Sequence, residues 1–517
     1  MENIIHILNI IIILVAYAMS LVSQMHMFQL NSYQLKSHIY RLRDNLSRLV
    51  PNIIFPAAAL LALPFKGVSA LLITDIIFVI AIITTIPKKA KKPLVYTARV
   101  KRQLVTTAVL TAIVLILCTM WGGRYSATAG AVALYFLAPV ITMIAAVINK
   151  PIEKQVSNRY INDAKRILSS MQGMKIIGVT GSYGKTSVKY YLNTLLKAKY
   201  NVLMTPGSFN TPMGVVRTVR EYLKASDEIF VCEMGARHVG DIKEICDLVH
   251  PHDGIITSIG PQHLETFKSL DNIKGTKFEL ADSLGENGLL FLNMDDENIR
   301  SYVGNRPHIG YSIHHDSDYR AKDISVSQRG TTFTVVKANG ESCDYTTRLI
   351  GEHNVLNIVG AIAVANTYGI PLESLKPQVR RLECVPHRLE LKDNGAAVII
   401  DDAYNSNPTG AKAALDVLSI FDGYRILVTP GMVELGEKQN ELNREFGRQA
   451  AQSADYIILV GKKQTEPIAA GIKESGYPAD KLYIADNINQ AIAQAYAVNS
   501  NGAKKFILLE NDLPDNY

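Results

Sequence analysis

The sequence predicts an α/β protein whose N-terminal part is a set of transmembrane helices. Three observations lead to this fold class. Apolar runs approaching the length of a membrane span recur through residues 1–150, strand-like and helix-like segments alternate through residues 151–383, and a second α/β pattern follows. We therefore expect a helical membrane domain at 1–150, a mostly parallel-sheet domain at 151–383 and a second α/β domain at 384–517.

The composition of the 517 residues supports this division and excludes several classes of protein. Residues 1–150 contain 14 basic and 3 acidic residues, whereas the remainder contains 40 basic and 44 acidic residues. A basic, apolar segment joined to a mildly acidic globular part is not typical of a nucleic-acid-binding protein, so we expect no nucleic acid as a partner. The five cysteines are far apart and form no C-x-x-C pair, which excludes a disulfide-stapled fold and the common zinc patterns.

The apolar runs lie at about residues 4–22, 49–65, 67–87, 104–121 and 126–148. A helix needs about 20 residues to cross the hydrocarbon core of a membrane. The run at 49–65 is the shortest and contains three prolines, so the pattern fits either five spans or four spans with one re-entrant segment. Asp75 lies in the third run, and we interpret it as an interfacial or internally hydrogen-bonded side chain in preference to a functional intramembrane carboxylate.

Lysine and arginine residues predict which side of the membrane each connection occupies. The segments 23–48 and 88–103 contain four and seven basic residues, whereas the alternate connections contain Lys66 and Arg124. Under the positive-inside rule the two basic segments are cytoplasmic, and five spans then place everything after Lys150 in the cytoplasm. We expect a multi-pass protein of the cell membrane with cytoplasmic catalytic domains. The basic stretch 88–102 is also a candidate contact for anionic membrane lipids.

A phosphate-binding loop is expected at the start of the globular part. Residues 174–180 resemble a buried strand, residues 188–199 look helical, and Gly-Ser-Tyr-Gly-Lys-Thr-Ser lies between them at 181–187. In such a turn the backbone N–H groups cradle phosphate oxygens, a lysine adds positive charge and a threonine hydroxyl can bind Mg²⁺. The spacing departs from the commonest G-x-x-x-x-G-K-[ST] form, because Thr180 stands at the first glycine position. The candidate nucleotide-binding residues are Gly181, Ser182, Gly184, Lys185, Thr186 and Ser187.

Further polar residues follow the next predicted strands, at the edge where open α/β sheets collect their ligands. Glu233 ends a predicted strand at 228–233, and its carboxylate is a candidate Mg²⁺ ligand. His263 follows a predicted strand at 253–260, and Lys277 lies with Glu279 on the helix that comes next. Together, in this order, these residues point to a nucleotide-dependent enzyme.

Eight sequence blocks in order resemble the Mur ligases, which are ATP-dependent amide-forming enzymes of peptidoglycan synthesis, and above all the members that add D-alanyl-D-alanine to a muramyl tripeptide. The blocks are Gly-Ser-Tyr-Gly-Lys-Thr-Ser (181–187), Gly-Ser-Phe-Asn-Thr-Pro-Met-Gly (207–214), Glu-Met-Gly-Ala-Arg (233–237), Thr-Ser-Ile-Gly-Pro-Gln-His-Leu (257–264), Gly-Glu-His-Asn-Val-Leu-Asn (351–357), Pro-His-Arg-Leu-Glu (386–390), Asp-Asp-Ala-Tyr-Asn-Ser-Asn-Pro (401–408) and Met-Val-Glu-Leu-Gly (432–436). The resemblance covers about residues 174–470 and implies a Rossmann-like C-terminal domain.

The resemblance also implies roles for the matching residues. Lys185 and Thr186 would meet the phosphates of ATP and Mg²⁺, Glu233 and His263 would hold two Mg²⁺ ions, and carbamylation would turn Lys277 into a carboxylate-like metal ligand. The other implied contacts are Arg388 with the γ-phosphate, Asn210 and Thr211 with phosphates or substrate, and His353, Asn354, Asn357, Asp402 and Asn407 with the nucleotide. The catalytic set would then be Lys185, Lys277, Arg388 and His263.

The implied reaction joins an amino acid, or a dipeptide of the D-Ala-D-Ala type, to a muramyl-peptide carboxylate through an acyl phosphate. Two departures from the family bear on the acceptor. The usual soluble domain that grips UDP is replaced by membrane spans, and Pro430-Gly-Met-Val433 stands where Gly-Asp-Met is usual. The acceptor is therefore either UDP-linked or lipid-linked.

Two other hypotheses compete with this function. The chain could be a membrane-bound ligase of another polymer, such as poly-γ-glutamate, or a non-catalytic ATP-binding membrane scaffold. The intact phosphoryl-transfer residues argue against the scaffold, and the blocks at 401–408 and 432–436 favour a muramyl peptide. The sequence identifies no obligate protein partner.

Overall fold

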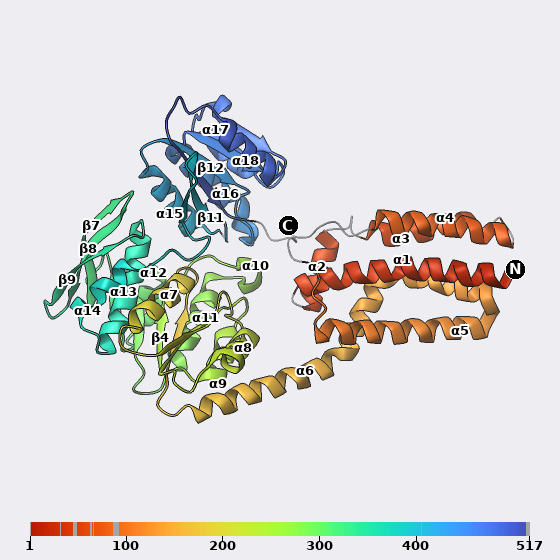
Figure 1. The fold of residues 1–517 in the computed structure, drawn as a ribbon, viewed down its shortest axis with the longest axis horizontal. Helices are drawn as coiled ribbons and strands as arrows, with labels where there is room; N and C mark the ends of the chain where they lie inside the picture. The colour runs from red at the N-terminus through yellow and green to blue at the C-terminus, as the bar shows by residue number, and fades with distance from the viewer. Residues whose placement is uncertain are drawn as a thin grey trace. The chain divides into compact units, whose positions relative to one another are not determined.

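A computed structural model describes residues 2–31, 33–44, 49–62, 65, 67–85, 93–404 and 406–512 (Figure 1). The chain divides into two compact units, of which one ends at Arg159 and the other begins at Tyr160. Helix α6 (Ala138–Ser170) contributes residues to both units.

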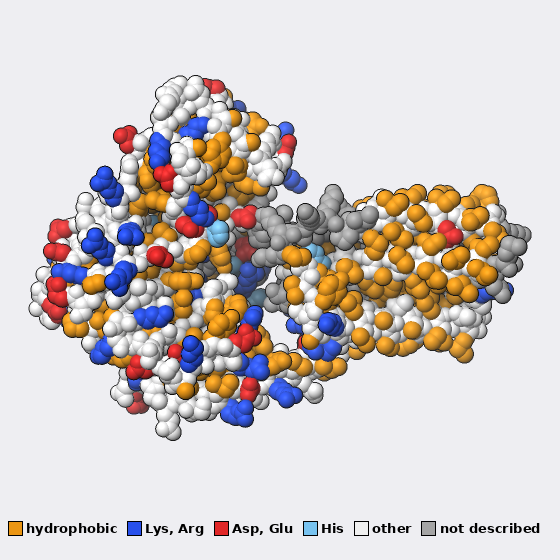
Figure 2. All heavy atoms as spheres, viewed as in Figure 1, with side chains coloured by type: hydrophobic (Ala, Val, Ile, Leu, Met, Phe, Trp, Pro, Cys, Tyr) orange, Lys and Arg blue, Asp and Glu red, His pale blue; other side chains and the backbone are white. Residues whose placement is uncertain are grey.

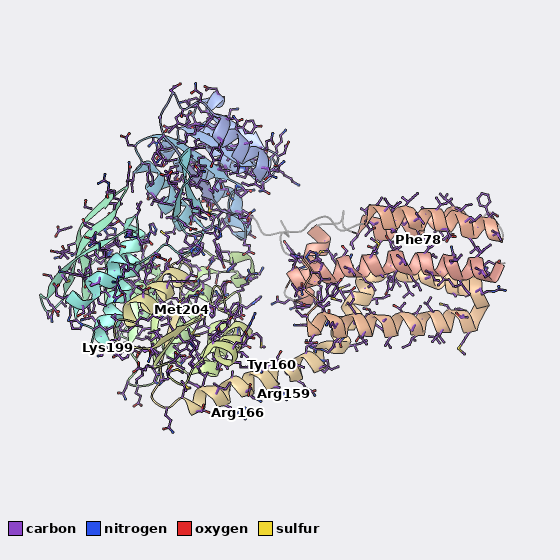
Figure 3. All side chains as sticks on the ribbon, in the orientation of Figure 1. Phe78, Arg159, Tyr160, Arg166, Lys199 and Met204 are labelled. Carbon is purple, nitrogen blue, oxygen red and sulfur yellow. The ribbon has the colours of Figure 1, made fainter. Side chains whose placement is uncertain are left out.

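The N-terminal unit is built from apolar helices that pack side by side (Figure 1). Helix α1 contacts α4 and α5, and Phe78 of α4, labelled in Figure 3, is fully buried with its ring 5.2 Å from that of Tyr135. The helices are α1 (Glu2–Leu30), α2 (Leu35–Asp44), α3 (Val50–Ala59) with a 3-10 turn (Leu60–Ala62), α4 (Val68–Thr84), α5 (Ala98–Phe136) and the first part of α6.

The outer surface of this unit is apolar as well. Figure 2 shows hydrophobic side chains over most of its visible face, and the side chain of Trp121 is 94% exposed. By length and composition, α1 and α5 could each cross a membrane, with mean hydropathy of 2.4 and 2.3 in their most apolar windows, whereas α3 and α4 are shorter. Within the predicted run 49–65, α3 and its 3-10 turn extend over Val50–Ala62, which is shorter than the roughly 20 residues of a full span.

The predicted separation between the runs 104–121 and 126–148 is confirmed. The backbone of α5 is non-helical at Gly122 and Gly123, and a Cβ on Gly130 would lie 2.8 Å from Sγ of Cys118, so the chain turns back at these glycines and the two runs lie on separate helical segments. The run 126–148 is divided at Leu137, between α5 and α6, and Pro139 stands in the first turn of α6, where its missing N–H donor is tolerated. Asp75 accepts a hydrogen bond of 2.8 Å from Nδ2 of Asn9, which confirms the internally bonded interpretation. The predicted topology residues Arg48, Lys66, Lys88, Lys89, Lys91 and Lys92 lie outside the described residues.

The second unit, Tyr160–Leu513, is called the catalytic unit because it contains the domains that the sequence predicts to be catalytic. It begins with a nine-stranded sheet in the order β2-β3-β1-β4-β5-β6-β7-β8-β9. The pairs from β2 to β7 are parallel, and β7, β8 and β9 pair antiparallel. The alternating polar residues of Tyr319–Leu349, rich in Thr and Val, predict a few antiparallel strands appended to this domain, and the pairing confirms them. The strands are β1 (Lys175–Thr180), β2 (Val202–Met204), β3 (Ile229–Glu233), β4 (Asp253–Ile256), β5 (Leu290–Asn293), β6 (Ile309–Ser312), β7 (Tyr319–Ser327), β8 (Gly330–Lys337) and β9 (Ser342–Thr347).

Helices cover both faces of the parallel part of this sheet. Ile177 and Val179 of β1 pack on one face with α7, α13 and α14, while Ile176 packs on the other face with the end of α6, α8 and α9. This alternation follows from the two-residue period of a strand buried on both faces. The helices are α7 (Lys185–Leu196), α8 (Pro212–Tyr222), α9 (Asp241–Val249), α10 (Leu264–Phe267), α11 (Leu270–Asp282), α12 (Glu297–Val303), α13 (Glu352–Thr367) and α14 (Leu372–Arg380).

A second, six-stranded sheet follows in the order β10-β11-β15-β12-β13-β14. Its strands are parallel apart from the antiparallel pair β10 and β11. The sequence predicts four of these strands, near 397–401, 425–429, 456–460 and 506–509. It misses β10, which is short and largely exposed, and β14, which is short and only partly buried. The elements are β10 (Glu390–Asp393), β11 (Ala397–Asp402), β12 (Tyr424–Thr429), β13 (Tyr456–Val460), β14 (Leu482–Ala485) and β15 (Lys505–Glu510), with α15 (Pro408–Ser419), α16 (Gln439–Ser453), α17 (Glu466–Glu474) and α18 (Ile488–Ala497).

Candidate active site

The predicted phosphate loop connects β1 to α7 at the carboxyl edge of the parallel sheet. Gly184 precedes α7 with φ of 80°, and a Cβ on it would lie 2.7 Å from Oδ1 of Asn357, so both its conformation and its space favour glycine. Ser182 holds the loop to the segment after β4, because its Oγ donates to the Gly260 carbonyl at 3.1 Å. The loop is therefore fixed from two sides, and Ser187 follows in the first turn of α7.

Lys185 is the central positive charge of the loop. Its Nζ donates to the carbonyl oxygens of Gly181 at 2.6 Å and Ser182 at 3.0 Å. Burial lowers the pKa of Lys185 to about 8, with the negative charge of Glu233 opposing this shift and the positive charge of Arg388 adding to it. The ammonium form thus prevails at pH 7, within electrostatic reach of two other predicted site residues.

Glu233, at the end of β3, connects the phosphate loop to this neighbouring strand through hydrogen bonds of its carboxylate. Its side chain is 1% exposed, and its Oε1 accepts from Oγ1 of Thr186 at 3.2 Å and Nδ2 of Asn210 at 3.0 Å. Burial raises the pKa of Glu233, but the ammonium groups of Lys189 and Lys185 outweigh it, so the pKa is lowered overall. An ionised carboxylate beside a threonine hydroxyl is a donor set that suits Mg²⁺.

Lys189 is a site residue that the sequence analysis missed. Its Nζ lies 2.9 Å from Oε2 of Glu233 and donates to the Gly207 carbonyl at 2.5 Å, and its side chain is fully buried. The available signal was a lysine one helical turn after Lys185 among the apolar residues of α7. It neutralises Glu233 and ties the loop after β2 to α7.

Replacing Lys189 by methionine is expected to destabilise the catalytic unit. The change leaves the Glu233 carboxylate buried without its cation, and breaking such a pair costs about 3–5 kcal/mol. The midpoint of thermal unfolding should fall clearly, and the double variant Lys189→Met/Glu233→Gln should recover most of the loss. Lys197→Met, at the exposed end of α7, is the matched control. Equal midpoints for Lys189→Met and Lys197→Met would show that the pair contributes nothing.

Lys277 and His263 lie on the segment after β4. The side chain of Lys277 on α11 is 2% exposed, and burial lowers its pKa well below the ordinary value, with the charge of Lys185 adding to the effect. His263 precedes α10 with φ of 52°, and its Nδ1 lies 2.6 Å from Oε2 of Glu434. Burial lowers the pKa of His263, although Glu434 opposes the shift. Burial therefore favours the neutral form of both side chains.

Arg388 lies in the hinge between the two sheets. Its neighbours His387 and Leu389 have left-handed φ of 60° and 52°, and its guanidinium lies 4.5 Å from the centre of the Tyr404 ring. The Leu389 N–H donates to Oδ1 of Asp402 at 3.2 Å. Burial raises the pKa of Asp402 to about 8, against the opposing charge of Arg388.

A group of three possible metal ligands lies beside this hinge, formed by His387, Glu390 and Asp401. The ammonium of Lys392 lies 2.6 Å from Asp401 and 3.0 Å from Glu390. Because this lysine already neutralises both carboxylates, the group is better explained as an ion-pair network that holds the hinge.

Several side chains that the sequence predicts to contact the nucleotide or the substrate form hydrogen bonds within the protein itself. Thr211 caps α8 by accepting from the Gly214 N–H at 3.3 Å, and Asn407 caps α15 by accepting from the Gly410 N–H at 2.8 Å. Asn354 accepts from Oη of Tyr191 at 2.8 Å and donates to the Ile350 carbonyl at 2.9 Å, so its polar atoms hold the start of α13. His353 lies beside it, and burial lowers its pKa to about 4. Asn357, also predicted to contact the nucleotide, lies against the phosphate loop at Gly184.

The chain is similar to known ligases over most of its globular part. The family model of the Mur ligase middle domain matches residues 179–365, and that of the Mur ligase glutamate ligase domain matches residues 387–509. The UDP-N-acetylmuramoyl-tripeptide–D-alanyl-D-alanine ligase of Escherichia coli is 30% identical over 369 residues, which are 68% of this chain and 80% of that enzyme.

Solved structures show the same similarity. The structure of MurF from Acinetobacter baumannii is similar with a TM-score of 0.62 and 26% sequence identity. The aligned region covers 69% of this chain and 77% of the MurF chain. The structure of MurF ligase from Thermotoga maritima in complex with ADP is similar with a TM-score of 0.62 and 25% sequence identity. The aligned region covers 69% of this chain and 80% of that MurF chain.

Proposed function

The chain belongs to the Mur ligase family and is an ATP-dependent, ADP-forming amide ligase of peptidoglycan precursor synthesis, and from this premise we propose that it joins D-alanyl-D-alanine to the free carboxylate of a UDP-linked muramyl tripeptide. The observation that supports this most is the meeting of Lys185, Thr186 and Glu233 at one sheet edge. A phosphate loop with a buried carboxylate beside it suits phosphoryl transfer from ATP.

The reaction activates a poor electrophile. An oxygen of the tripeptide carboxylate attacks the γ-phosphorus of ATP, the bond to the β-phosphate oxygen breaks, and ADP leaves. The amine of the dipeptide then attacks the acyl carbon, the tetrahedral intermediate loses inorganic phosphate, and the amine gives up a proton as the amide forms. Each step develops negative charge on phosphoryl or acyl oxygens, which fixed positive groups stabilise.

Lys185 and Arg388 are the side chains that we propose for this task. Lys185 reaches the phosphates from the loop, and Arg388 reaches the γ-phosphate from the hinge, already within electrostatic range of Lys185. Asn210, bonded to Glu233, would position the phosphates or the acceptor, and Asp402 and Asn407 would contact the nucleotide from the second domain. Closure of the two domains would bring the amine to the acyl phosphate.

Mg²⁺ fits the donor set around Glu233. Thr186 and Glu233 would hold one ion and His263 a second, and bound metal would neutralise charge on the transferring phosphoryl group. We also propose that Lys277 is carbamylated. A buried neutral amine is the form that adds CO₂, and Lys277 has a strongly lowered pKa. The resulting carbamate would be an additional oxygen ligand for the metal.

We propose that the N-terminal unit is embedded in the cell membrane with the catalytic unit in the cytoplasm. Two of its helices are long and apolar enough to span, and large apolar side chains cover its outside. The full-length chain should stay in the membrane fraction after washing at alkaline pH. Recovery in the soluble fraction would contradict the embedding.

A lipid-linked muramyl tripeptide is a second candidate acceptor. The helical unit stands directly before the ATP-binding domain, where the family has its UDP-gripping domain. Gln24, Asn31, His38 and Gln103 are buried in it, and each has a polar side-chain atom with no hydrogen-bond partner in the described part of the chain. Polar groups inside a membrane bundle commonly mark a pathway for a polar substrate, which favours this second candidate.

The two acceptors can be separated with the full-length protein in detergent. We expect ATP and D-Ala-D-Ala to convert the UDP-linked tripeptide to the pentapeptide, measured by the mass of the product. The lipid-linked tripeptide is offered in parallel, in mixed micelles. Product from the lipid-linked form alone would move acceptor recognition to the N-terminal unit, and would contradict the UDP-linked proposal.

A further inference from the structure

His263 and Glu434 form a contact between the two α/β domains of the catalytic unit. Nδ1 of His263 lies 2.6 Å from Oε2 of Glu434, although the two residues are 171 positions apart. Helix α10 starts just after His263 and packs against the 3-10 turn Gly436–Lys438, which follows Glu434. The side chains are 15% and 24% exposed, so the hydrogen bond is largely shielded from water.

The backbone at both ends of this contact is strained. His263 has φ of 52° and Glu434 has φ of 64°, in the left-handed region that residues with a Cβ seldom adopt. Such conformations persist where the surrounding structure fixes them, and they concentrate at functional sites. Strain at both partners of one hydrogen bond indicates that the two loops are held for this contact.

We propose that Glu434 is a positioning residue for the metal site, and that its carboxylate holds His263 so that Nε2 of the imidazole faces the bound metal. An ionised carboxylate accepts hydrogen bonds and donates none, so Nδ1 carries the proton and Nε2 keeps its lone pair. Metal-binding histidines commonly donate their other ring N–H to a carboxylate, which fixes the tautomer and the ring orientation. His263 lies within electrostatic reach of Lys185, on the phosphate-loop side of the contact.

His263 and Glu434 belong to different domains, and this links the metal site to domain closure. The histidine comes from the ATP-binding domain and the carboxylate from the domain beyond the hinge. The metal site is therefore complete when the domains are in contact, so metal binding and domain closure stabilise each other. The inference rests on the proposed role of His263 as a metal ligand.

The test measures Mn²⁺ binding to the full-length protein with ADP present, by electron paramagnetic resonance of the free ion. We expect Glu434→Ala to weaken the affinity for Mn²⁺ by about 10–100-fold, the usual cost of losing a carboxylate behind a metal-binding histidine. Glu434→Gln should lose less, because its carbonyl can still accept from Nδ1. Glu437→Ala, three residues further on and exposed, is the matched control and should leave the affinity unchanged.

The outcomes separate this inference from the function on which it rests. Unchanged affinity in Glu434→Ala, with weaker binding in His263→Ala, would overturn the role of Glu434 alone. Unchanged affinity in His263→Ala would overturn the metal assignment of the proposed function and the inference with it. Tighter Mn²⁺ binding in Glu434→Ala would mean that the carboxylate competes with the metal for His263, which also contradicts the inference. Glu434→Gly, which relieves the left-handed strain, checks that weaker binding is not a folding defect.

Discussion

Replacing Lys185 by alanine is expected to lower kcat/KM for ATP about 10³-fold, the loss typical of removing one charge-stabilising group from a transition state. Lys185 is the cation of the phosphate loop, and its ammonium now bonds to the loop carbonyls of Gly181 and Ser182. Bound phosphate oxygens would take over these bonds. The rate is followed as ADP release in the presence of acceptor and dipeptide, and ATP affinity is measured separately.

The control for this prediction is Lys197→Ala on the same helix. Lys197 is exposed at the end of α7, so its removal takes away a positive charge without touching the loop. Full activity in Lys197→Ala with loss in Lys185→Ala places the effect in the loop. Comparable rates in the two variants would show that the phosphate assignment is wrong.

Replacing Lys277 by alanine is expected to lower the ligation rate at least about 100-fold, and short-chain carboxylates such as acetate should restore part of it. Lys277 is buried within electrostatic reach of Lys185 and its pKa is strongly lowered by burial, which favours the neutral amine that reacts with CO₂. The cavity left by the alanine can admit a small carboxylate that replaces the carbamate. Rates are compared with and without acetate, against the same concentration of chloride.

Thermal unfolding tests the assignment of Lys277 independently of the ligation rate. Because the pKa of Lys277 is lower in the folded state, the unfolded chain binds the extra proton at neutral pH, and stability rises with pH towards the ordinary lysine value of about 10.4. In CO₂-free buffer, where the amine is not carbamylated, Lys277→Met should therefore unfold at a higher temperature than the wild type at pH 7, and the difference should shrink as the pH is raised. A variant that is inactive, unresponsive to acetate and no more stable would contradict both the carbamate and the buried neutral amine.

Local sequence signals were sufficient for the centre of the fold. The apolar run at 174–180 bounded by Gly181 predicts β1 and the phosphate loop, because a buried strand, a glycine turn and a helix start are all contiguous in sequence. Tyr319–Leu349 alternates polar and apolar residues, and this period of two correctly predicts β7, β8 and β9. The four-residue strands β10 and β14 are too short to show such a pattern and could not be predicted in this way.

Contacts between distant segments could not be predicted from local patterns. Lys189 looks like an ordinary helix lysine until β3 brings Glu233 to its ammonium. Glu434 could be matched to a family block, but its partner His263 belongs to the other domain. Asn354 is expected from the sequence to contact the nucleotide. In the structure its side-chain oxygen and nitrogen instead form hydrogen bonds with Tyr191 and Ile350 of its own domain.

The most direct test of the account is phosphate release from ATP by the full-length protein in detergent. The account predicts release that requires both the muramyl tripeptide and D-Ala-D-Ala, with one phosphate for each amide formed, and that is lost in Lys185→Ala. Release that is independent of the dipeptide, or the same in Lys185→Ala, would contradict the assignment of this chain as a D-alanyl-D-alanine-adding ligase.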